Sequence, residues 1–305
     1  MTVRNASKAP ARTDSTGVGP TLPAPLKAAA TRAQSARWLL RTHGALDESG
    51  LRILFYHRVS DDDDALAVPP QRFREQMDFL ASEGYDVIDV TEAADRLIAG
   101  APPARTIGLN FDDGYLDNAE HALPVLEEHE FRATVFVPTG AIDGTTSFAW
   151  YRRQPPLLAW DDIVELDRAG TLRFEAHSVT HPSLIALEDD AAWEEIAGSK
   201  LALEARLGRP VDAFCYPAGL FGDRDRELVA QAGFRVAVSC EPGVNVPGTD
   251  LLALHRRQID PADSILDFRA KVGGGHDSPL PLRGLYRRIR YGERKRTPRL
   301  AGALR

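Results

Sequence analysis

The segment 107-IGLNFDDGYLDN-118 places two carboxylates, Asp112 and Asp113, directly after an apolar run. A short apolar run bounded by glycine and acidic residues is typical of a buried strand. Consecutive side chains on a strand point to opposite faces, so burying the pair would leave at least one charge in an unfavourable environment. A solvent-exposed turn, in which Asp and Gly are both common, is the simpler interpretation. The rest of the chain must decide between a turn and a functional site.

Predicted strands and helices alternate along most of the chain. This alternation indicates an α/β fold with parallel strands and helical crossovers, either a barrel or a doubly wound sheet. In both architectures, ligands bind where the strands end at their carboxyl edges. We expect strands within residues 51–60, 86–90, 106–111, 132–140, 172–178, 211–219, 235–240 and 251–260, and helices within 69–85, 91–100, 118–130, 160–170, 189–207 and 225–233.

The chain divides by charge into an acidic body and two basic ends. It has 305 residues, 43% of them hydrophobic, and a formal net charge of −7. By count, residues 1–50 carry about 7 basic and 3 acidic side chains and residues 271–305 about 10 and 2, which leaves roughly −19 for residues 51–270. The start of the chain is rich in Ala, Pro, Ser and Thr. We therefore expect a flexible N-terminal segment at 1–48 that could include a short helix, a folded domain at 49–270 and a basic C-terminal tail at 271–305.

These features bear on partners and location. An acidic body argues against nucleic acid as a partner, whereas the basic tail could contact a membrane surface peripherally. Neither a secretory signal nor an apolar run of transmembrane length is visible, so the sequence by itself suggests a cytoplasmic protein and leaves its location open. Cys215 and Cys240 lack the spacing of a disulfide framework or of a zinc finger.

His177 and His181 lie four residues apart in the segment HSVTHP. On a helical turn this spacing places two imidazoles on one face, as metal ligands often are; two unrelated surface histidines are the alternative. An acidic residue from another strand end would complete an Asp-His-His site. One of the paired aspartates could then bind the metal, while its neighbour takes a proton from the activated water.

Six segments occur in the order in which polysaccharide deacetylases carry them: ILFYHRV, FDDGY, RATVFVPTG, LAWDDIVEL, HSVTHP and FCYPAG. Over roughly residues 51–260 the chain thus resembles this family, which is carbohydrate esterase family four with its NodB homology domain. The resemblance implies a deformed (β/α) barrel of the polysaccharide deacetylase type. It also implies a metal-dependent hydrolase that removes acetyl groups from N-acetylated sugars.

The resemblance further implies roles for individual residues. Asp112 corresponds to the general base and Asp113 to a metal ligand, and His177 and His181 correspond to the other two ligands. His255, in the segment LLALH, is the candidate for the catalytic acid, with a supporting or buried histidine as the alternative.

A second set of residues is expected to bind substrate or the oxyanion. The run Tyr216, Pro217, Ala218 and Gly219 resembles the family's groove wall, in which the backbone N–H after the proline, here that of Ala218, faces the oxyanion. Trp160 could stack on a sugar ring, although packing at the start of a helix is the commoner role of such a residue. His57 could line the same rim, and the irregular segment 143–158 has the length of a substrate loop.

Two positions depart from the family pattern. Asn110 stands where a threonine is common before the Phe-Asp-Asp run. Cys215 stands where many members carry an arginine that braces the base, although a branch with Tyr-Pro also lacks that arginine.

The hypothesis from sequence is therefore a metal-dependent deacetylase acting on a polysaccharide or oligosaccharide that contains N-acetylglucosamine. Zn²⁺ is the favoured metal, with Co²⁺, Ni²⁺ and Fe²⁺ as alternatives. A carbohydrate O-acetyl esterase, a small-amide hydrolase with the same site, and a catalytically inactive glycan-binding protein are the alternative functions. Members of the family are often extracytoplasmic and act on cell walls or exopolysaccharides.

The two neighbouring aspartates should respond differently to substitution. We expect Asp113→Ala to abolish metal binding, because it removes a ligand, and Asp112→Asn to keep the metal but lose turnover, because it removes the base. Metal content per protein and acetate release from an acetylated chitooligosaccharide measure the two effects. Wild-type turnover by Asp112→Asn would contradict the assignment of the base.

Overall fold

The computed structural model describes residues 24–100 and 104–277. Its strands are β1 (Arg52–Tyr56), β2 (Arg58–Val59), β3 (Ala67–Val68), β4 (Asp86–Ile88), β5 (Thr106–Asp112), β6 (Ala133–Val137), β7 (Leu172–Ala176), β8 (Ala213–Cys215), β9 (Val236–Val238) and β10 (Arg257–Gln258). Its α-helices are α1 (Ala24–Thr42), α2 (Pro70–Ser82), α3 (Val90–Ile98), α4 (Leu123–Glu128), α5 (Thr139–Ile142), α6 (Trp160–Ala169), α7 (Asp189–Leu207), α8 (Asp223–Gln231) and α9 (Ile265–Val272). A π-helical turn η1 (Asn118–Ala122) and 3₁₀ turns η2 (Leu184–Ala186), η3 (Pro217–Gly219) and η4 (Leu251–Ala253) complete the set.

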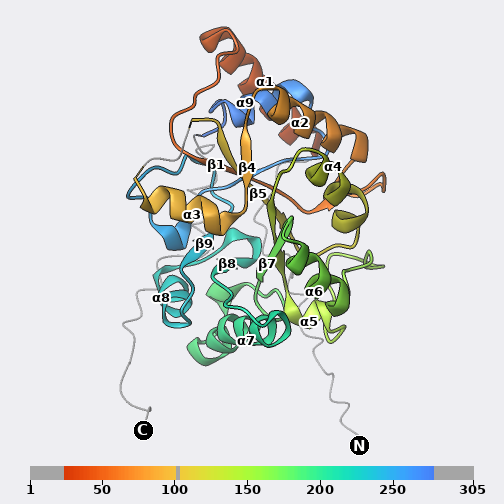
Figure 1. The fold of residues 1–305 in the computed structure, drawn as a ribbon, viewed down its shortest axis with the longest axis vertical. Helices are drawn as coiled ribbons and strands as arrows, with labels where there is room; N and C mark the ends of the chain where they lie inside the picture. The colour runs from red at the N-terminus through yellow and green to blue at the C-terminus, as the bar shows by residue number, and fades with distance from the viewer. Residues whose placement is uncertain (1–23, 101–103, 278–305) are drawn as a thin grey trace, which may run out of the picture.

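A curled parallel sheet forms the centre of the molecule. Its strands lie in the order β10, β1, β5, β6, β7, β8 and β9, with β4 paired to β5, and every ladder between them is parallel. A parallel bridge between Val238 and Leu254 brings the far edge of the sheet back towards β10. The helices surround this curled sheet (Figure 1), so the expectation of a deformed (β/α) barrel is confirmed.

The sequence of β5 explains its central place. All seven of its residues are buried, as expected for a strand that is covered on both faces in a parallel sheet. Its neighbours β1 and β6 are also buried throughout. The main apolar cluster lies between these strands and the helices that cover them, and it includes Phe73 of α2, Phe111 of β5 and Phe174 of β7. The carboxyl ends of the buried strands therefore meet at one rim.

The structure corrects three local expectations. His177 and His181 do not share a helical turn, because residues 177–183 form an irregular loop after β7. The helix expected at 118–130 divides into η1 and α4, with Pro124 in the first turn of α4, where its missing N–H costs no hydrogen bond. Helix α3 begins at Val90, one residue before the expected range of 91–100, because the Asp89 carboxylate caps it by accepting hydrogen bonds from the backbone N–H of Thr91 and of Glu92.

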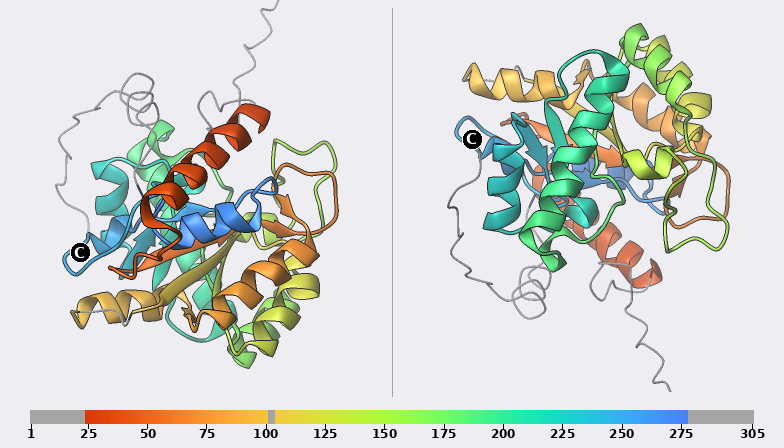
Figure 2. Two further views of the ribbon diagram at one scale, coloured as in Figure 1. Left: turned by 90° about the horizontal axis from the view of Figure 1, so that it is seen from above. Right: turned by 90° about the horizontal axis from the view of Figure 1, so that it is seen from below.

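Helix α1 packs beside α9, far from it in sequence (Figure 2, left). The indole N–H of Trp38 donates to the carbonyl of Gly273 over 3.1 Å, and the Ser35 hydroxyl donates to the Asp267 carboxylate over 2.6 Å. Residues 24–42 of the expected flexible N-terminal segment thus form a packed helix, while the proposed domain boundaries stay a prediction. The basic tail lies outside the described residues apart from its first seven, 271–277. Within residues 24–100 and 104–277, no helix combines the length and the apolar character needed to cross a bilayer.

Trp38 should be the main anchor of α1. Its side chain is buried against Gly273 and Gly275, so Trp38→Ala removes a large apolar group and leaves a cavity. We expect the free energy of unfolding to fall by about 3–5 kcal/mol, measured by urea denaturation. Leu40→Ala is the control, because Leu40 is 79% exposed on the same helix and its loss should change the stability by only about 0.5 kcal/mol. Equal effects of the two substitutions would show that α1 is not anchored in this way.

Candidate active site

The paired aspartates are buried at the carboxyl end of β5. Asp112 is the last residue of the strand, and the two side chains are 3% and 1% exposed. The simpler interpretation, a solvent-exposed turn, is therefore wrong. The backbone turns sharply here, because Asp113 has φ 75° and Gly114 has φ 70°. A Cβ at Gly114 would lie 2.7 Å from the Val137 side chain, so only glycine fits after the pair.

His177 follows β7 and presents one ring nitrogen to Asp113. Its Nδ1 lies 2.8 Å from the carbonyl oxygen of Cys215, which makes Nδ1 the donor and leaves the lone pair on Nε2. Nε2 lies 3.7 Å from Oδ1 of Asp113. The Nε2 atom of His181 lies at the same distance from that oxygen, and the two imidazole rings are nearly perpendicular. Two nitrogens and one carboxylate oxygen thus converge.

This group fits a divalent cation. Oδ1 of Asp113 is buried and has no hydrogen-bond partner within the described part of the chain, which is unusual for a carboxylate oxygen. Ligand atoms about 2.1 Å from a tetrahedral Zn²⁺ lie roughly 3.4 Å from one another, close to the separations found here. Two imidazoles and one carboxylate are also a donor set common at zinc sites with an open position for water or substrate. Asp113, His177 and His181 could therefore hold a metal.

The charge balance of the group favours a cation as well. Burial and the neighbouring charge of Asp112 hold the pKa of Asp113 well above its usual value. Burial lowers the pKa of His177 to about 4 and holds that of His181 well below its usual value. Both rings are therefore neutral at pH 7 and can offer lone pairs. A bound cation would relieve the repulsion between the two carboxylates.

Arg256 compensates the charge of Asp112. Its guanidinium donates to both carboxylate oxygens of Asp112, over 2.7 and 2.8 Å, and also to the carbonyl of Ser239. The side chain of Arg256 is fully buried and lies over the Phe55 ring at 4.2 Å. Burial alone would raise the pKa of Asp112, but the Arg256 guanidinium lowers it to about 2. Asp112 is therefore held ionised beside the Asp113 group.

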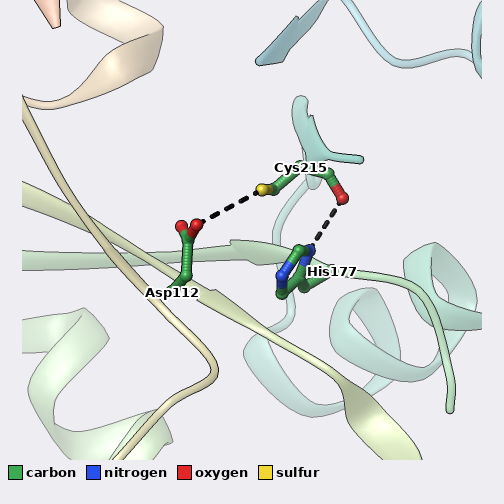
Figure 3. A group of neighbouring side chains, drawn as sticks. All are labelled: Asp112, His177 and Cys215. Atoms are coloured by element: carbon green, nitrogen blue, oxygen red, sulfur yellow. Dashed lines mark hydrogen bonds between the residues drawn. The ribbon is translucent and has the colours of Figure 1, made fainter. Parts of the chain in front are cut away.

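A second cluster that could hold a metal comprises Asp112, His177 and Cys215 (Figure 3). The Cys215 sulfur lies 3.8 Å from Asp112 and accepts a hydrogen bond from Arg256 over 3.0 Å. Burial raises the pKa of the Cys215 thiol well above its usual value, so the thiol is protonated and is a poor metal ligand. A cation here would also lie against the Arg256 guanidinium. The Asp113 group is therefore the better metal site.

Aromatic side chains of the loop between α5 and α6 form a wall beside His181. Phe148 and Trp150 stack with ring centroids 4.6 Å apart, and the centroid of Trp150 lies 5.2 Å from that of His181. Tyr151 donates a hydrogen bond to Asp64 over 2.6 Å, which ties this loop to the loop after β2. The loop expected to bind substrate thus lies against the candidate metal site.

The expected groove wall forms a tight turn after β8. Ala218 has left-handed backbone angles of φ 55° and ψ 12°, and it is exposed. Tyr216 is fully buried, its hydroxyl donates to the carbonyl of Leu252, and its ring stacks on Phe221. Pro217 and Gly219 are buried as well, and a Cβ at Gly219 would collide with Cys240. Within this turn, Tyr216 supports the backbone from below and Ala218 faces outwards.

The structure brings His57 to the site but not His255. His57 follows β1, and the charges of Asp112 and Arg256 both act on its pKa, which burial lowers. The ring of His255 packs against Gly243, and its backbone N–H donates to the side chain of Asn245. The Nδ1 atom of His255 is buried and has no hydrogen-bond partner within the described part of the chain.

Trp160 opens α6, but its surfaces are largely engaged. Its indole N–H donates to the Asp143 carboxylate over 2.7 Å, and the Arg206 guanidinium lies over its ring at 5.1 Å. Stacking on a sugar ring stays a prediction for Trp160.

Backbone strain is concentrated at this rim. Seven non-glycine residues of the described chain have positive φ, and four of them are Asp113, Ser178, His181 and Ala218. Left-handed angles cost free energy for residues with a Cβ and persist where the surrounding structure holds them, often at functional sites. The candidate site is therefore a preorganised part of the fold.

Comparisons with known proteins agree with the fold. Residues 99–237 match the family model for polysaccharide deacetylases. The chain is 27% identical to YxkH of Bacillus subtilis (strain 168), a polysaccharide deacetylase by name, over 73% of this chain and 76% of that protein. The solved structure of the Streptococcus pyogenes deacetylase PplD in complex with acetate superposes with a TM-score of 0.65 at 25% identity, over 74% of this chain and 99% of that one. These comparisons identify residues 99–237 as a polysaccharide deacetylase domain.

The name of a further relative specifies a polymer. The poly-β-1,6-N-acetyl-D-glucosamine N-deacetylase of Staphylococcus aureus (strain MSSA476) is 22% identical over 65% of this chain and 69% of its own length.

Two features of this deacetylase were not identified in the sequence. Arg256 lies 144 residues from Asp112 in the chain. The sequence hinted at such a residue only because Cys215 occupies the position at which many family members carry the arginine that braces the base. The aromatic wall was indicated only weakly, by the run SFAWY at residues 147–151 within an irregular loop. The expected Asp112, Asp113, His177 and His181 lie together, and Ala218 and His57 lie on elements that end at the same rim.

Loss of Arg256 should destabilise the deacetylase strongly. Arg256→Met leaves the buried Asp112 carboxylate without its partner, and we expect about 3–5 kcal/mol less free energy of unfolding at pH 7, measured by urea denaturation. The folded-state pKa of Asp112, about 2, lies below the ordinary value of 3.8 for an aspartate, so the stabilisation is present above pH 3.8 and is lost as the pH falls through about 2. The difference between wild type and variant should therefore shrink between pH 4 and pH 2.

Two matched variants test the cause. Arg96→Met removes an arginine whose ion pairs with Asp86 and Glu92 are partly exposed, and it should cost at most about 1 kcal/mol. Adding Asp112→Asn to Arg256→Met should recover part of the loss, because the unpaired charge is then gone. No recovery in the double variant would mean that Arg256 acts through packing alone.

Proposed function

We propose that this polysaccharide deacetylase is metal-dependent and removes N-acetyl groups from a glycan that contains N-acetylglucosamine. The observation that carries the proposal is the convergence of Asp113, His177 and His181 beside an Asp112 carboxylate that Arg256 keeps ionised. The name of the Staphylococcus aureus relative supports a β-1,6-linked N-acetylglucosamine polymer as the substrate class. Zn²⁺ is the favoured metal because imidazole nitrogens outnumber oxygen ligands in the group.

Each side chain has a distinct role in this proposal. Asp113, His177 and His181 would hold the cation, whose charge would polarise the acetamide carbonyl and lower the pKa of the attacking water. Asp112 accepts the proton of that water, and Arg256 positions Asp112 and fixes its ionisation. The outward-facing turn supports Ala218 N–H as a donor to the oxyanion.

His57 is the better candidate for the proton donor to the departing amine. It is half-buried at the end of β1, within electrostatic reach of Asp112 and of Arg256. Burial lowers the pKa of His57, so its ring is mainly neutral at pH 7. It would donate to the amine only after taking up the proton that the attacking water releases to Asp112. The amide of Asn118, in the π-helical turn η1, donates to the carbonyl of His57 over 3.0 Å and orients this residue. His255, which was expected in this role, packs against Gly243 instead.

Substitution of His57 and of His255 should affect turnover differently. With oligomers of β-1,6-linked N-acetylglucosamine and added Zn²⁺, His57→Gln should lower kcat by roughly 10²- to 10⁴-fold, the usual effect of losing a general acid. His255→Gln should keep kcat within a few-fold of wild type, because the His255 ring packs against Gly243. Metal content should be unchanged in both variants. A full loss of turnover in His255→Gln with normal activity in His57→Gln would return the role to His255.

A parallel assay tests whether the enzyme hydrolyses an N-acetyl amide or an O-acetyl ester. Acetate release from the same oligomers and from acetylated xylan, under identical metal conditions, separates N- from O-deacetylation. Release from xylan alone would contradict N-deacetylation, and tight binding of the oligomer without acetate release under any metal would indicate a binding protein.

A further inference from the structure

Helix α1 presents an outer face that no described part of the chain covers. Three of its leucines, Leu26, Leu39 and Leu40, are 56%, 39% and 79% exposed. The inner face, with Ser35 and Trp38, is the one that packs against α9 and the glycines that follow it. At 100° per residue, Leu26, Ala29, Ala33 and Leu40 fall within one narrow arc opposite Trp38, so the outer face carries a continuous apolar stripe.

Arginines flank this stripe on both sides. Arg32 lies on one side, and Arg37 and Arg41 lie on the other, all of them exposed. The helix contains no acidic residue, and none of these three guanidiniums forms an ion pair with any residue in 24–100 or 104–277. The outer face of α1 thus carries an excess of positive charge, whereas residues 51–270 have a net charge of roughly −19.

The basic C-terminal segment begins beside α1. Gly275 packs against the Trp38 ring, and the Arg52 guanidinium holds the Asp277 carboxylate. The next residues, 278–305, contain nine basic side chains and one acidic side chain, counted directly from the sequence. The described start of this basic segment, residues 271–277, therefore lies beside α1.

The N-terminal end of α1 also borders the rim of the candidate site. The Lys27 ammonium contacts the Asp260 carboxylate at 2.5 Å. Parallel pairing of Phe55 with Gln258 places Asp260 level with His57, two residues further along each chain. A surface that bound the outer face of α1 would thus lie close to the rim that carries His57.

We propose that the outer face of α1 docks the protein on an anionic lipid surface. Leucines at the centre of the stripe would enter the interface between headgroups and acyl chains, while the arginines beside them bind lipid phosphates. The apolar part is small, so docking depends on both contributions and weakens as salt screens the charges. Docking would hold the rim of the site near membrane-associated glycan. It goes beyond the proposed function and does not require it.

Co-sedimentation with vesicles tests the docking directly. The full chain is mixed with vesicles of phosphatidylcholine alone, or with one third phosphatidylglycerol, at 50 and 500 mM NaCl. We expect binding to the anionic vesicles at low salt and little binding to the neutral ones. The double variant Arg37→Gln/Leu40→Gln should bind the anionic vesicles roughly tenfold more weakly or worse, because it removes one charge and one apolar anchor.

A matched double variant controls for general charge and hydrophobicity. Arg168→Gln/Leu201→Gln changes an exposed arginine on α6 and a leucine on α7 that is 66% exposed, and α7 lies at the opposite end of the molecule from α1 (Figure 1; Figure 2, right). This variant should bind like wild type. Thermal denaturation verifies that both variants are folded.

Three outcomes would overturn the proposal. One is the absence of wild-type binding to anionic vesicles at low salt, and another is equal binding by the two double variants, which would assign binding to other basic segments. The third is a dimer in light scattering that Arg37→Gln/Leu40→Gln dissociates while vesicle binding is unchanged, which would make the outer face of α1 a contact between two copies. Because the assay contains neither glycan nor added metal, failure here is separate from failure of the proposed deacetylation.

Discussion

Two adjacent carboxylates buried at the end of a central strand are the constraint on which this structure depends. An isolated buried carboxylate is strongly disfavoured, and two of them side by side repel each other. The chain treats the two differently. Asp112 receives the full bidentate guanidinium of Arg256, whereas Asp113 receives two neutral imidazoles and one weak hydroxyl contact from Tyr115. One charge is compensated within the protein, and the other is left for a cation.

This asymmetry accounts for the layout of the rim. Arg256 reaches Asp112 only because the curl of the sheet returns the segment after β9 to lie near β1 and β5. Its guanidinium also contacts Cys215 and Ser239 and covers Phe55, so it joins β8, the end of β9, β1 and β5 at one point. The base is thus positioned by the closure of the barrel itself, and disruption of that closure would disturb both stability and the site.

The loops complete the arrangement at an energetic cost. Asp113, Ser178, His181 and Ala218 adopt left-handed angles that residues with a Cβ rarely take. These residues follow three different strands, and each bends its loop over the centre of the rim. The aromatic pair Phe148 and Trp150 then packs against His181 and limits its motion. Strain of this kind is tolerated because the surrounding core is rigid and buried, and it keeps the ligand atoms close together before any ligand binds.

Features that depend on residues close together in the chain could be predicted before the structure was known. The alternation of apolar strands and amphipathic helices specifies parallel pairing, and parallel pairing puts Asp112, Asp113, His177 and the turn at Ala218 at one edge. Contacts between distant segments became visible only in the folded chain. Arg256 as the partner of Asp112, His57 rather than His255 beside the site, and α1 packed on α9 all join residues far apart in the chain. Such contacts depend on how the sheet curls and on which face an extended residue presents, and a shift of one residue reverses that face.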